Sequence, residues 1–537
     1  MSKIFKKVPI EVQNRSGFDC SHSNTFTAKV AALTPCLVDH IPPNTDLSLD
    51  VSCEVNLPPA ISDFYGQIEA RLEFFFVPYR VIWAGWKYFF VQPPLGGNNM
   101  IPSNKPTAIQ IKDVPGAQIL PNNTFAERGS LADMLGWKGK TTVNTQNSGI
   151  PNILPFVAYQ KIYDDFYRDS RITQPIFTPP TSTSQQSWKN LPWILGDDLT
   201  TGNKKWFNMS NDDMSLFDLR QRCWDKDYFT NATTAPQAGA SSSLEFDIQT
   251  TPIDGAGGPQ EGTASFSISA LRVANSLQHF AEINGLAGQR MADQQYARFG
   301  CYPSDASLDR PIYLGQKRFS VYKRSVYQQT ENLTNGNPNP FSGILGNKTS
   351  ALSGYGEGFM GKFKAKDAGL LFVMFSLVPK PVYSTGTRRY LTYSKLSDFP
   401  EPLLQGTGDQ PIYDFELVSG AWFDKSKVFG YTQRFAEIKF MQDEVHGLLS
   451  DGENLDMFQL QRSFNTEQEL STEFLEIPQN YLDQITTADA SISEFGCWCQ
   501  CGFKYKKVMP FAAYSMPTLE APKDTHTVLI DNGGKRL

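Results

Sequence analysis

The sequence has little charge and no long apolar run. Aspartate, glutamate, lysine and arginine make up 19% of the 537 residues, and the net charge is −6. A helical bundle or a disordered chain would carry more charge and fewer aromatic residues, so both classes are excluded. A protein that binds nucleic acid over its whole surface is strongly basic, so any such contact here is confined to local patches. Because no stretch approaches 18 uncharged apolar residues, we expect no membrane insertion.

Histidine and cysteine, which often serve in metal and catalytic sites, are also scarce. The five histidines have no partner at metal-ligand spacing, and the eight cysteines are spread too widely for a disulfide scaffold. No nucleophile-elbow, zinc-protease or dinucleotide-binding motif occurs. We therefore predict no catalytic residue, no metal and no cofactor. The alternating Cys497, Cys499 and Cys501 favour core packing, with metal binding and redox chemistry as alternatives.

The residues that are abundant are typical of β-structure with many turns. Aromatic residues reach 13%, and there are 40 glycines and 35 prolines. Apolar and polar residues alternate strictly in 47–55, 67–76 and 495–505, which predicts strands with one buried and one solvent-exposed face. The continuous apolar run at 370–378 predicts a strand that is covered on both faces. A shorter alternation at 436–440 predicts one more strand.

The middle of the chain has the pattern of helices and loops. Apolar residues spaced by three and four positions indicate an amphipathic helix near 156–169, and a second helical segment covers 267–298. Segments rich in Pro, Gly, Asn, Ser and Thr predict long loops at 92–125, 171–215, 231–266 and 328–361. The chain is therefore expected to form one antiparallel β-sandwich with insertions at least as large as the sandwich.

Two groups of side chains are candidates for binding. Basic residues near both ends of the chain could hold single-stranded nucleic acid, although solubility and protection of a sheet edge would explain them as well: Lys3, Lys6, Lys7, Arg15, Lys504, Lys506 and Lys507. Aromatic residues in one segment could anchor a contact between subunits, although core packing would also explain them: Trp83, Trp86, Tyr88, Phe89 and Phe90.

Several distinctive blocks follow one another along the chain. They include FDCSH at 18–22, FFFVPYR at 74–80, LPF followed by AY, IY and FYRD within 154–169, DYFT at 227–230, RPIYLG at 310–315 and FGYTQRFAE at 429–437. In this order the blocks resemble the major capsid proteins of microviruses (Microviridae), in particular the gokushovirus-like branch. Each block alone has low specificity, whereas the ordered series extends over most of the chain.

The resemblance implies an all-β core, a single eight-stranded antiparallel jelly roll of the viral capsid type with large loop and helical insertions. We expect a basic N-terminal arm at 1–25, main jelly-roll strands at 26–91 and 368–510, insertions at 92–367, and a C-terminal tail at 511–537. No separate second domain is expected.

The resemblance also implies a structural virion protein of a single-stranded DNA bacteriophage. Sixty copies would form a T=1 icosahedral shell around circular DNA, through pentamer intermediates, after assembly in the bacterial host cytoplasm. The first ten residues contain three lysines and no signal-peptide pattern, which agrees with that location. The implied partners are the packaged DNA, a small basic DNA-binding protein and a scaffolding protein of the same phage, and a host-cell receptor. Sixty chains of charge −6 bring a net −360, so a separate basic protein would have to neutralise the genome.

Two other functions remain open on the residues alone. A phage receptor-binding or tail protein would also be β-rich, acidic and long-looped, but it should show trimer-forming repeats or a coiled-coil segment, and neither is visible. A jelly-roll enzyme acting on carbohydrates would need two convergent carboxylates in a cleft. The paired acids of the sequence are adjacent residues, which do not converge on one site.

Overall fold

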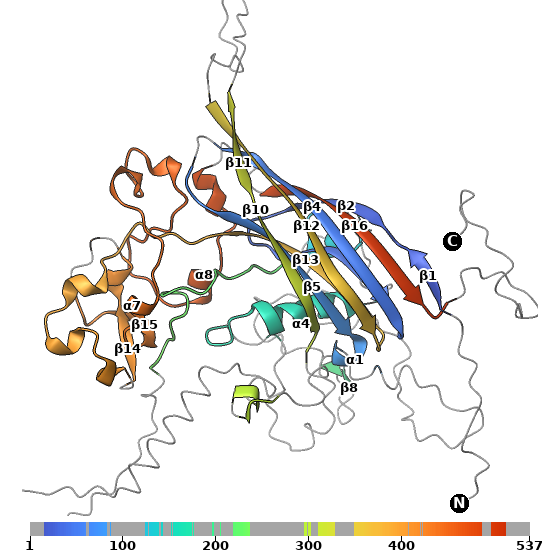
Figure 1. Cartoon of the computed structure of the whole chain (residues 1–537), viewed down its shortest axis with the longest axis horizontal. Coiled ribbons are helices and arrows are strands. Elements are labelled where there is room, and N and C mark those ends of the chain that lie inside the picture. The colour runs from blue at the N-terminus through green and yellow to red at the C-terminus, as the bar shows by residue number, and fades with distance from the viewer. Residues whose placement is uncertain are drawn as a thin grey trace, which may run out of the picture.

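The computed structural model (Figure 1) describes a set of segments separated by gaps. They are residues 15–60, 64–82, 86, 124–126, 128–138, 141–142, 152, 154–173, 176, 196–197, 204–205, 218–236, 295–297, 299–301, 310–327, 348–405, 408–418, 420, 423–485 and 496–511.

The larger sheet has six strands and is antiparallel throughout. Its strands are β1 (Ser16–Asp19), β2 (His22–Ala28), β4 (Thr45–Ala60), β11 (Tyr322–Tyr327), β12 (Lys348–Ala365) and β16 (Cys497–Met509). The order is β1-β16-β4-β12-β11, and β2 pairs with β16 beyond the end of β1. The first strands of the chain therefore lie beside the last strand (Figure 1).

The second sheet has four antiparallel strands. They are β3 (Thr34–Ile41), β5 (Ile68–Pro78), β10 (Ile312–Ser320) and β13 (Gly369–Pro379), in the order β10-β5-β13-β3. Every residue of β13 is buried, so the strand predicted from the apolar run at 370–378 is confirmed, together with its cover on both faces.

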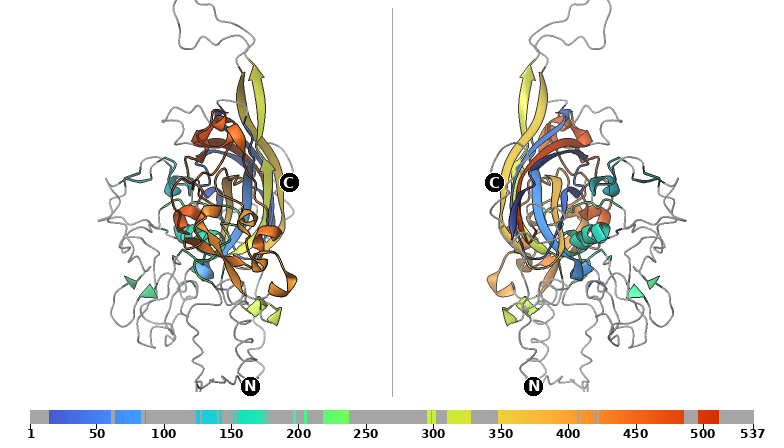
Figure 2. Two further views of the ribbon diagram at one scale, coloured as in Figure 1. Left: turned by 90° about the vertical axis from the view of Figure 1, so that its left-hand side faces the viewer. Right: turned by 90° about the vertical axis from the view of Figure 1, so that its right-hand side faces the viewer.

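One hydrophobic core lies between the two sheets. It contains Leu49 and Val51 of β4, Leu72 and Phe74 of β5, and Val373 of β13, none of them more than 1% exposed. The alternation predicted for 47–55 is confirmed, because all five of its apolar side chains are buried in this core. The end-on views in Figure 2 show the two sheets packed against each other, with the β11–β12 hairpin extending beyond them.

Short helices cover the outer face of the four-stranded sheet. They are α1 (Tyr79–Ile82), α3 (Leu131–Met134), α4 (Leu154–Ile162) and the π-helix η4 (Tyr163–Tyr167). Their apolar residues form a second core with Phe75 and Phe372 of the sheet. The segment 156–169, where a helix was predicted, lies mostly in α4 and η4. Most of 267–298 lies outside the described residues, and residues 295–297 of it are helical.

The polar face predicted for strand β5 is covered over part of its length. Arg71 is 2% exposed and Glu73 is 7% exposed. Residues 218–225 lie over this face, where Arg71 pairs with Asp225 and Glu73 pairs with Arg222. The prediction of a solvent-exposed face was wrong at these two positions, because internal ion pairs allow charged side chains to be covered, whereas the Glu69 side chain on the same face remains 36% exposed.

Three strands of the main sheets, β10, β11 and β12, lie inside the region expected to consist of insertions. The loop predicted at 328–361 was wrong for its second half, since β12 begins at Lys348. The inward positions Gly356 and Gly358 of β12 lie against β10, and a Cβ at Gly356 would be 2.4 Å from the Phe319 ring. The glycines therefore permit a close approach of two strands and do not mark a turn.

A lobe formed by residues 380–485 extends from the sandwich (Figure 1, orange, left). Its two short strands are β14 (Asp409–Tyr413) and β15 (Val428–Gln433), and its α-helices are α7 (Ala436–Lys439) and α8 (Thr472–Leu475). The strand predicted at 436–440 was wrong, because α7 occupies it. The 3-10 helices of the lobe are η7 (Arg389–Thr392), η8 (Leu396–Asp398), η9 (Pro402–Leu404), η10 (Asp414–Glu416), η11 (Gly447–Leu449) and η12 (Asp456–Phe458). The last one, η13 (Tyr481–Gln484), packs through Tyr481 and Leu482 into the core between the sheets.

The lobe has its own hydrophobic core, formed around Phe229, Tyr383 and Phe429. Two further strand pairs lie outside the sandwich and the lobe: β6 (Thr124–Ala126) with β7 (Thr141–Thr142), and β8 (Gly196–Asp197) with β9 (Lys204–Lys205). Within the described residues, sheets therefore dominate, the main sheets are antiparallel and the helices are short.

Candidate functional site

Strand β16 carries the C-terminal basic candidates and separates them onto two faces. Its burial alternates with period two, so Lys504 and Lys506 are exposed on the outer face of the six-stranded sheet, together with Trp498. Lys507 points to the opposite, buried face, where its ammonium pairs with Asp39 of β3 and lies over the Tyr505 ring. Lys507 is therefore a structural cation, whereas Lys504 and Lys506 are accessible.

The neighbouring strands add two cations to this outer face. In the register of the sheet, Lys506 lies opposite Ser48 of β4, and Ser48 lies opposite Lys362 of β12. Lys364 of β12 lies one row further on and is also exposed. Four lysines from two strands thus gather at one end of the face, with β4 between them.

Carboxylates share the same face and set its local charge. Asp46 is held by Arg15, whose guanidinium lies 2.7 Å away and also donates to the Val508 carbonyl at 2.9 Å. Asp19 of β1 lies opposite Lys506, and hydrogen bonds from the Ser21 hydroxyl and backbone N–H lower the pKa of Asp19. Arg15 therefore fastens the edge of the sheet and is already neutralised. The basic candidates Lys3, Lys6 and Lys7 lie outside the described residues.

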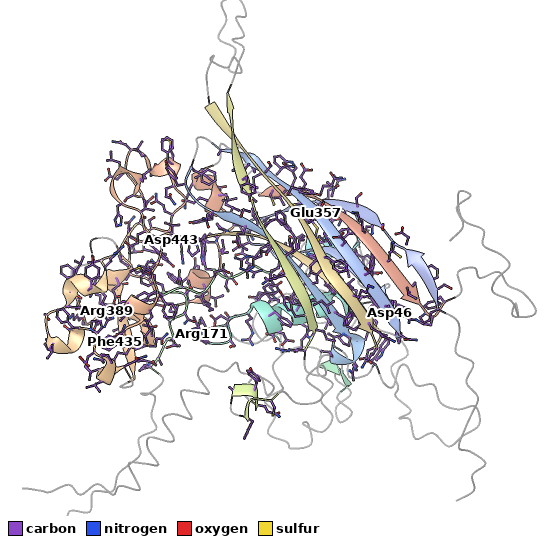
Figure 3. All side chains as sticks on the ribbon, viewed as in Figure 1. Asp46, Arg171, Glu357, Arg389, Phe435 and Asp443 are labelled. Atoms are coloured by element: carbon purple, nitrogen blue, oxygen red, sulfur yellow. The ribbon has the colours of Figure 1, made fainter. Side chains whose placement is uncertain are left out.

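Three exposed aromatic rings share the outer face with the lysines. Trp498 of β16 is 46% exposed, Tyr355 of β12 is 59% exposed and Phe359 of β12 is 62% exposed. All three project from the outer face, which also carries Glu54 and Glu357 toward its other end. Figure 3 labels Asp46 near one end of this face and Glu357 further along it. Phe359 lies in the same row as Lys504, because both are opposite Asp50 of β4, whereas Tyr355 and Trp498 lie further along the face, opposite Glu54 and Asn56. A face that carries both exposed rings and ammonium groups offers stacking for bases and charge for phosphates, the combination that single-stranded nucleic acid requires.

The sequence identified only part of this group. The sequence alone does not single out Tyr355 and Phe359, because they lie in the glycine-rich segment predicted to be a loop, nor Lys362 and Lys364, which directly follow that segment. A register shift between Phe359 and Gly361 moves the outward positions from odd to even numbers, so a simple period-two pattern does not continue through it. The alternation of glycine with Tyr355, Glu357 and Phe359 was the available signal.

The aromatic anchor candidates are only partly described. Trp86 is half-buried and packs against the second core, with its ring centroid 4.7 Å from that of Tyr79. This position agrees with core packing, the alternative that the sequence left open. Trp83, Tyr88, Phe89 and Phe90 lie outside the described residues.

The three alternating cysteines face the core between the sheets. Cys497, Cys499 and Cys501 are at most 1% exposed, and Cys53 of β4 lies opposite Cys501 with 2.9 Å between the sulfur atoms. The contact with Cys501 and burial both raise the pKa of Cys53. No group of three or more His, Cys, Asp or Glu in the described segments could hold a metal ion. Core packing is the role that the geometry supports, since a neutral thiol behaves as a small apolar group.

The described part of the chain contains no helix with both the length and the apolar character needed to cross a membrane.

Comparison with known proteins gives matches over nearly the whole chain. A family model described as "Capsid protein (F protein)" matches residues 6–261 and 259–519. Capsid protein VP1 of Chlamydia phage 1 is 23% identical over 614 aligned positions, which cover 97% of this chain and 98% of that protein. Capsid protein VP1 of Bdellovibrio phage phiMH2K is 24% identical and covers 96% and 97%, and that of Spiroplasma virus 4 is 22% identical and covers 94% and 95%.

Proposed function

Since the chain belongs to the phage capsid protein (F protein) family, we propose that copies of it assemble into a T=1 icosahedral shell that encloses circular single-stranded DNA. The family is a structural one, so the chain is a capsid protein of a microvirus, located in the virion, and not an enzyme, as the sequence predicted. The observation that carries the proposal is the family match over most of the chain.

The strand order supports a jelly roll built from eight of the strands. Taken in chain order, β2, β3, β4 and β5 alternate between the two sheets, and β12, β13 and β16 do so again after β10. The resulting neighbours are β2-β16-β4-β12 in one sheet and β3-β13-β5-β10 in the other. Two interlocked Greek keys produce these neighbours, so we assign the sandwich to the jelly-roll class. β1 and β11 extend this framework.

Assembly of the chain alone tests the proposal directly. Sixty copies of 60.1 kDa predict closed particles of about 3.6 MDa, measured by native mass spectrometry and seen in negative-stain electron micrographs. Pentamers that close only in the presence of a scaffolding protein and DNA would support the same proposal. A subunit that stays monomeric even with both partners present would contradict it.

We propose that the outer face of the six-stranded sheet contacts the packaged DNA. Lys504 and Lys506 supply charge for phosphates, Lys362 and Lys364 extend it, and the exposed rings supply stacking surfaces. The carboxylates on the same face limit the net positive charge. A small basic protein of the phage would therefore supply most of the neutralisation, and scaffolding protein and host receptor remain further proposed partners.

Replacing Lys504 and Lys506 with alanine should weaken binding of a single-stranded oligonucleotide and lower its salt dependence. Each lost phosphate contact reduces the magnitude of the slope of log K against log salt by about 0.7. The magnitude of the slope measured for the double variant should therefore be smaller than that of the wild type by about 1.4. Fluorescence anisotropy over a salt series measures this slope. The matched control replaces Lys425 and Lys439, two exposed lysines of the lobe, and should leave it unchanged. An unchanged slope in the Lys504/Lys506 variant would rule the sheet face out as the contact.

A further inference from the structure

The lobe exposes an unusual amount of apolar surface. Thirteen of the 23 large hydrophobic side chains that the described residues expose lie within it: Tyr390, Leu391, Leu396, Phe399, Leu403, Phe423, Val428, Ile438, Phe440, Met441, Leu448, Leu455 and Met457. Isolated exposed hydrophobic residues are normal on protein surfaces, but a concentration in one region marks an interaction site. We refer to this set, which is defined by exposure and not by contiguity, as the apolar face of the lobe.

The most exposed members are held by short, well-defined elements. Leu396 is 89% exposed and begins η8, and Leu403 is 87% exposed and lies in η9. Met441 is 91% exposed and follows α7 closely. Because hydrogen-bonded turns fix the backbone at or beside each residue, these side chains are presented to solvent by the fold.

Two of the carboxylates among these residues already have hydrogen-bond partners within the chain. The carboxylate of Asp398 accepts hydrogen bonds from the backbone N–H groups of Ser394 and Lys395, each at 3.1 Å. Glu437 accepts hydrogen bonds from the Tyr393 hydroxyl and the Gln410 amide, each at 2.6 Å. A second protein can therefore cover the apolar side chains without breaking the hydrogen bonds of these two carboxylates, as the core of a protein–protein interface requires.

The charge of the lobe indicates a protein partner and not nucleic acid. Residues 380–485 contain nine lysines and arginines against 17 aspartates and glutamates, a net charge of −8. Phosphate groups would be repelled by such a surface. The acidic lobe thus differs from the lysine-bearing sheet face in both charge and apolar character.

We propose that the apolar face of the lobe docks onto a second copy of this chain in the shell, an inference that rests on the proposed function. The lobe lies at one end of the long axis of the described structure (Figure 1), and Figure 3 places Arg389, Phe435 and Asp443 in it, far from Asp46 at the other end. In a closed shell of identical copies, the lateral ends of each subunit meet neighbouring subunits. The proposal thus places the long axis of the subunit along the shell, where the partner at the lobe is another copy.

Oxidation of Met441 reports directly on this contact. Shells are prepared from cells that make the chain with the other virion proteins, and one half is dissociated into subunits. Hydrogen peroxide converts an accessible methionine to its sulfoxide. The oxidation rate of Met441 should therefore be lower in the shell than in the free subunit by a factor of about ten or more. Peptide mass spectrometry measures the rate, and Met374, which is 1% exposed in the subunit, is the protected reference.

The results of the oxidation experiment distinguish a failure of this inference from a failure of the proposed function. Equal oxidation of Met441 in shells and free subunits would overturn the inference while leaving the shell in place. Slow oxidation in the free subunit as well would also overturn it, since another part of the same chain would then cover the face. If no shells form under any condition, the proposed function itself fails.

Substitutions in the apolar face provide a second measurement. The double variant Leu396→Asp, Leu403→Asp should unfold at the wild-type temperature, because both side chains are exposed in the subunit, yet its yield of shells should fall by roughly tenfold or more. The matched control is Tyr322→Ser, which removes a 66% exposed ring outside the lobe and should assemble normally. Shells of the double variant at wild-type yield would overturn the proposal.

Discussion

Replacing Arg462 with alanine is expected to destabilise the folded subunit by about 3–5 kcal/mol. Arg462 is only 7% exposed, and its guanidinium is surrounded by four aromatic rings. The guanidinium carbon lies 4.5 Å from the ring centroid of Phe474 and 4.7 Å from that of Trp224. Phe464 at 5.2 Å and Tyr383 at 5.5 Å complete the cage. Alanine would leave a cavity among these rings and remove every cation–π contact at once.

The effect should be large because Arg462 joins the lobe to the sandwich. Trp224 belongs to the core between the sheets, whereas Tyr383 and Phe474 belong to the core of the lobe. The guanidinium donates to the Tyr383 hydroxyl at 3.1 Å and to the Phe474 carbonyl at 2.9 Å. The Tyr383 hydroxyl in turn donates to the carboxylate of Asp227 at 2.6 Å. Loss of Arg462 should therefore loosen the lobe as well as lower the overall stability.

Thermal unfolding of the subunit and amide hydrogen exchange in the lobe measure the two effects. Arg462→Met should recover part of the loss, because methionine refills the volume without restoring the cation. The control is Arg388→Ala, which removes an exposed arginine of the same lobe from its pair with Glu444 and should change little. A wild-type unfolding temperature for Arg462→Ala would show that the aromatic cage does not hold the lobe.

The sequence predicted correctly those strands in which the alternation of apolar and polar residues along the strand alone determines which side chains are buried. In β4 the alternation of Leu47, Leu49 and Val51 with polar residues places the former in the core, and the structure confirms it. In β16 the same reasoning puts Lys504 and Lys506 on the outer face with Trp498. Such patterns are local, since successive side chains of a strand point to opposite faces.

The failures concern features that depend on a distant segment. Gly356 reads as part of a turn until β10 is placed against it, and Arg71 reads as exposed until residues 218–225 cover it. Lys507 is adjacent to Lys506 but pairs with Asp39 of another strand, which no local pattern reveals. The apolar face of the lobe is invisible for the same reason, because Leu396 and Leu403 could equally belong to a core. Tertiary contacts therefore decided what periodicity alone could not.

Replacing Arg222 with leucine is expected to destabilise the subunit by about 3–5 kcal/mol, because it leaves a buried carboxylate without its cation. The Arg222 side chain is 13% exposed and that of its partner Glu73 is 9% exposed, with 2.6 Å between the closest nitrogen and oxygen. The Tyr167 hydroxyl donates to the same carboxylate oxygen at 2.5 Å. That hydrogen bond alone does not offset the cost of burying an unpaired charge.

The double variant Glu73→Leu, Arg222→Leu separates the pair from its members. Two leucines of suitable volume replace a buried ion pair with little net loss, so the double variant should be more stable than either single variant. The four unfolding free energies form a cycle whose coupling term we expect to reach about 3 kcal/mol. Arg80→Leu is the control, since Arg80 and Asp367 form an exposed pair and its loss should cost no more than about 1 kcal/mol. If the losses of unfolding free energy in the two single variants simply add in the double variant, Glu73 and Arg222 act independently. The covered charged face of β5 would then have another source of stability.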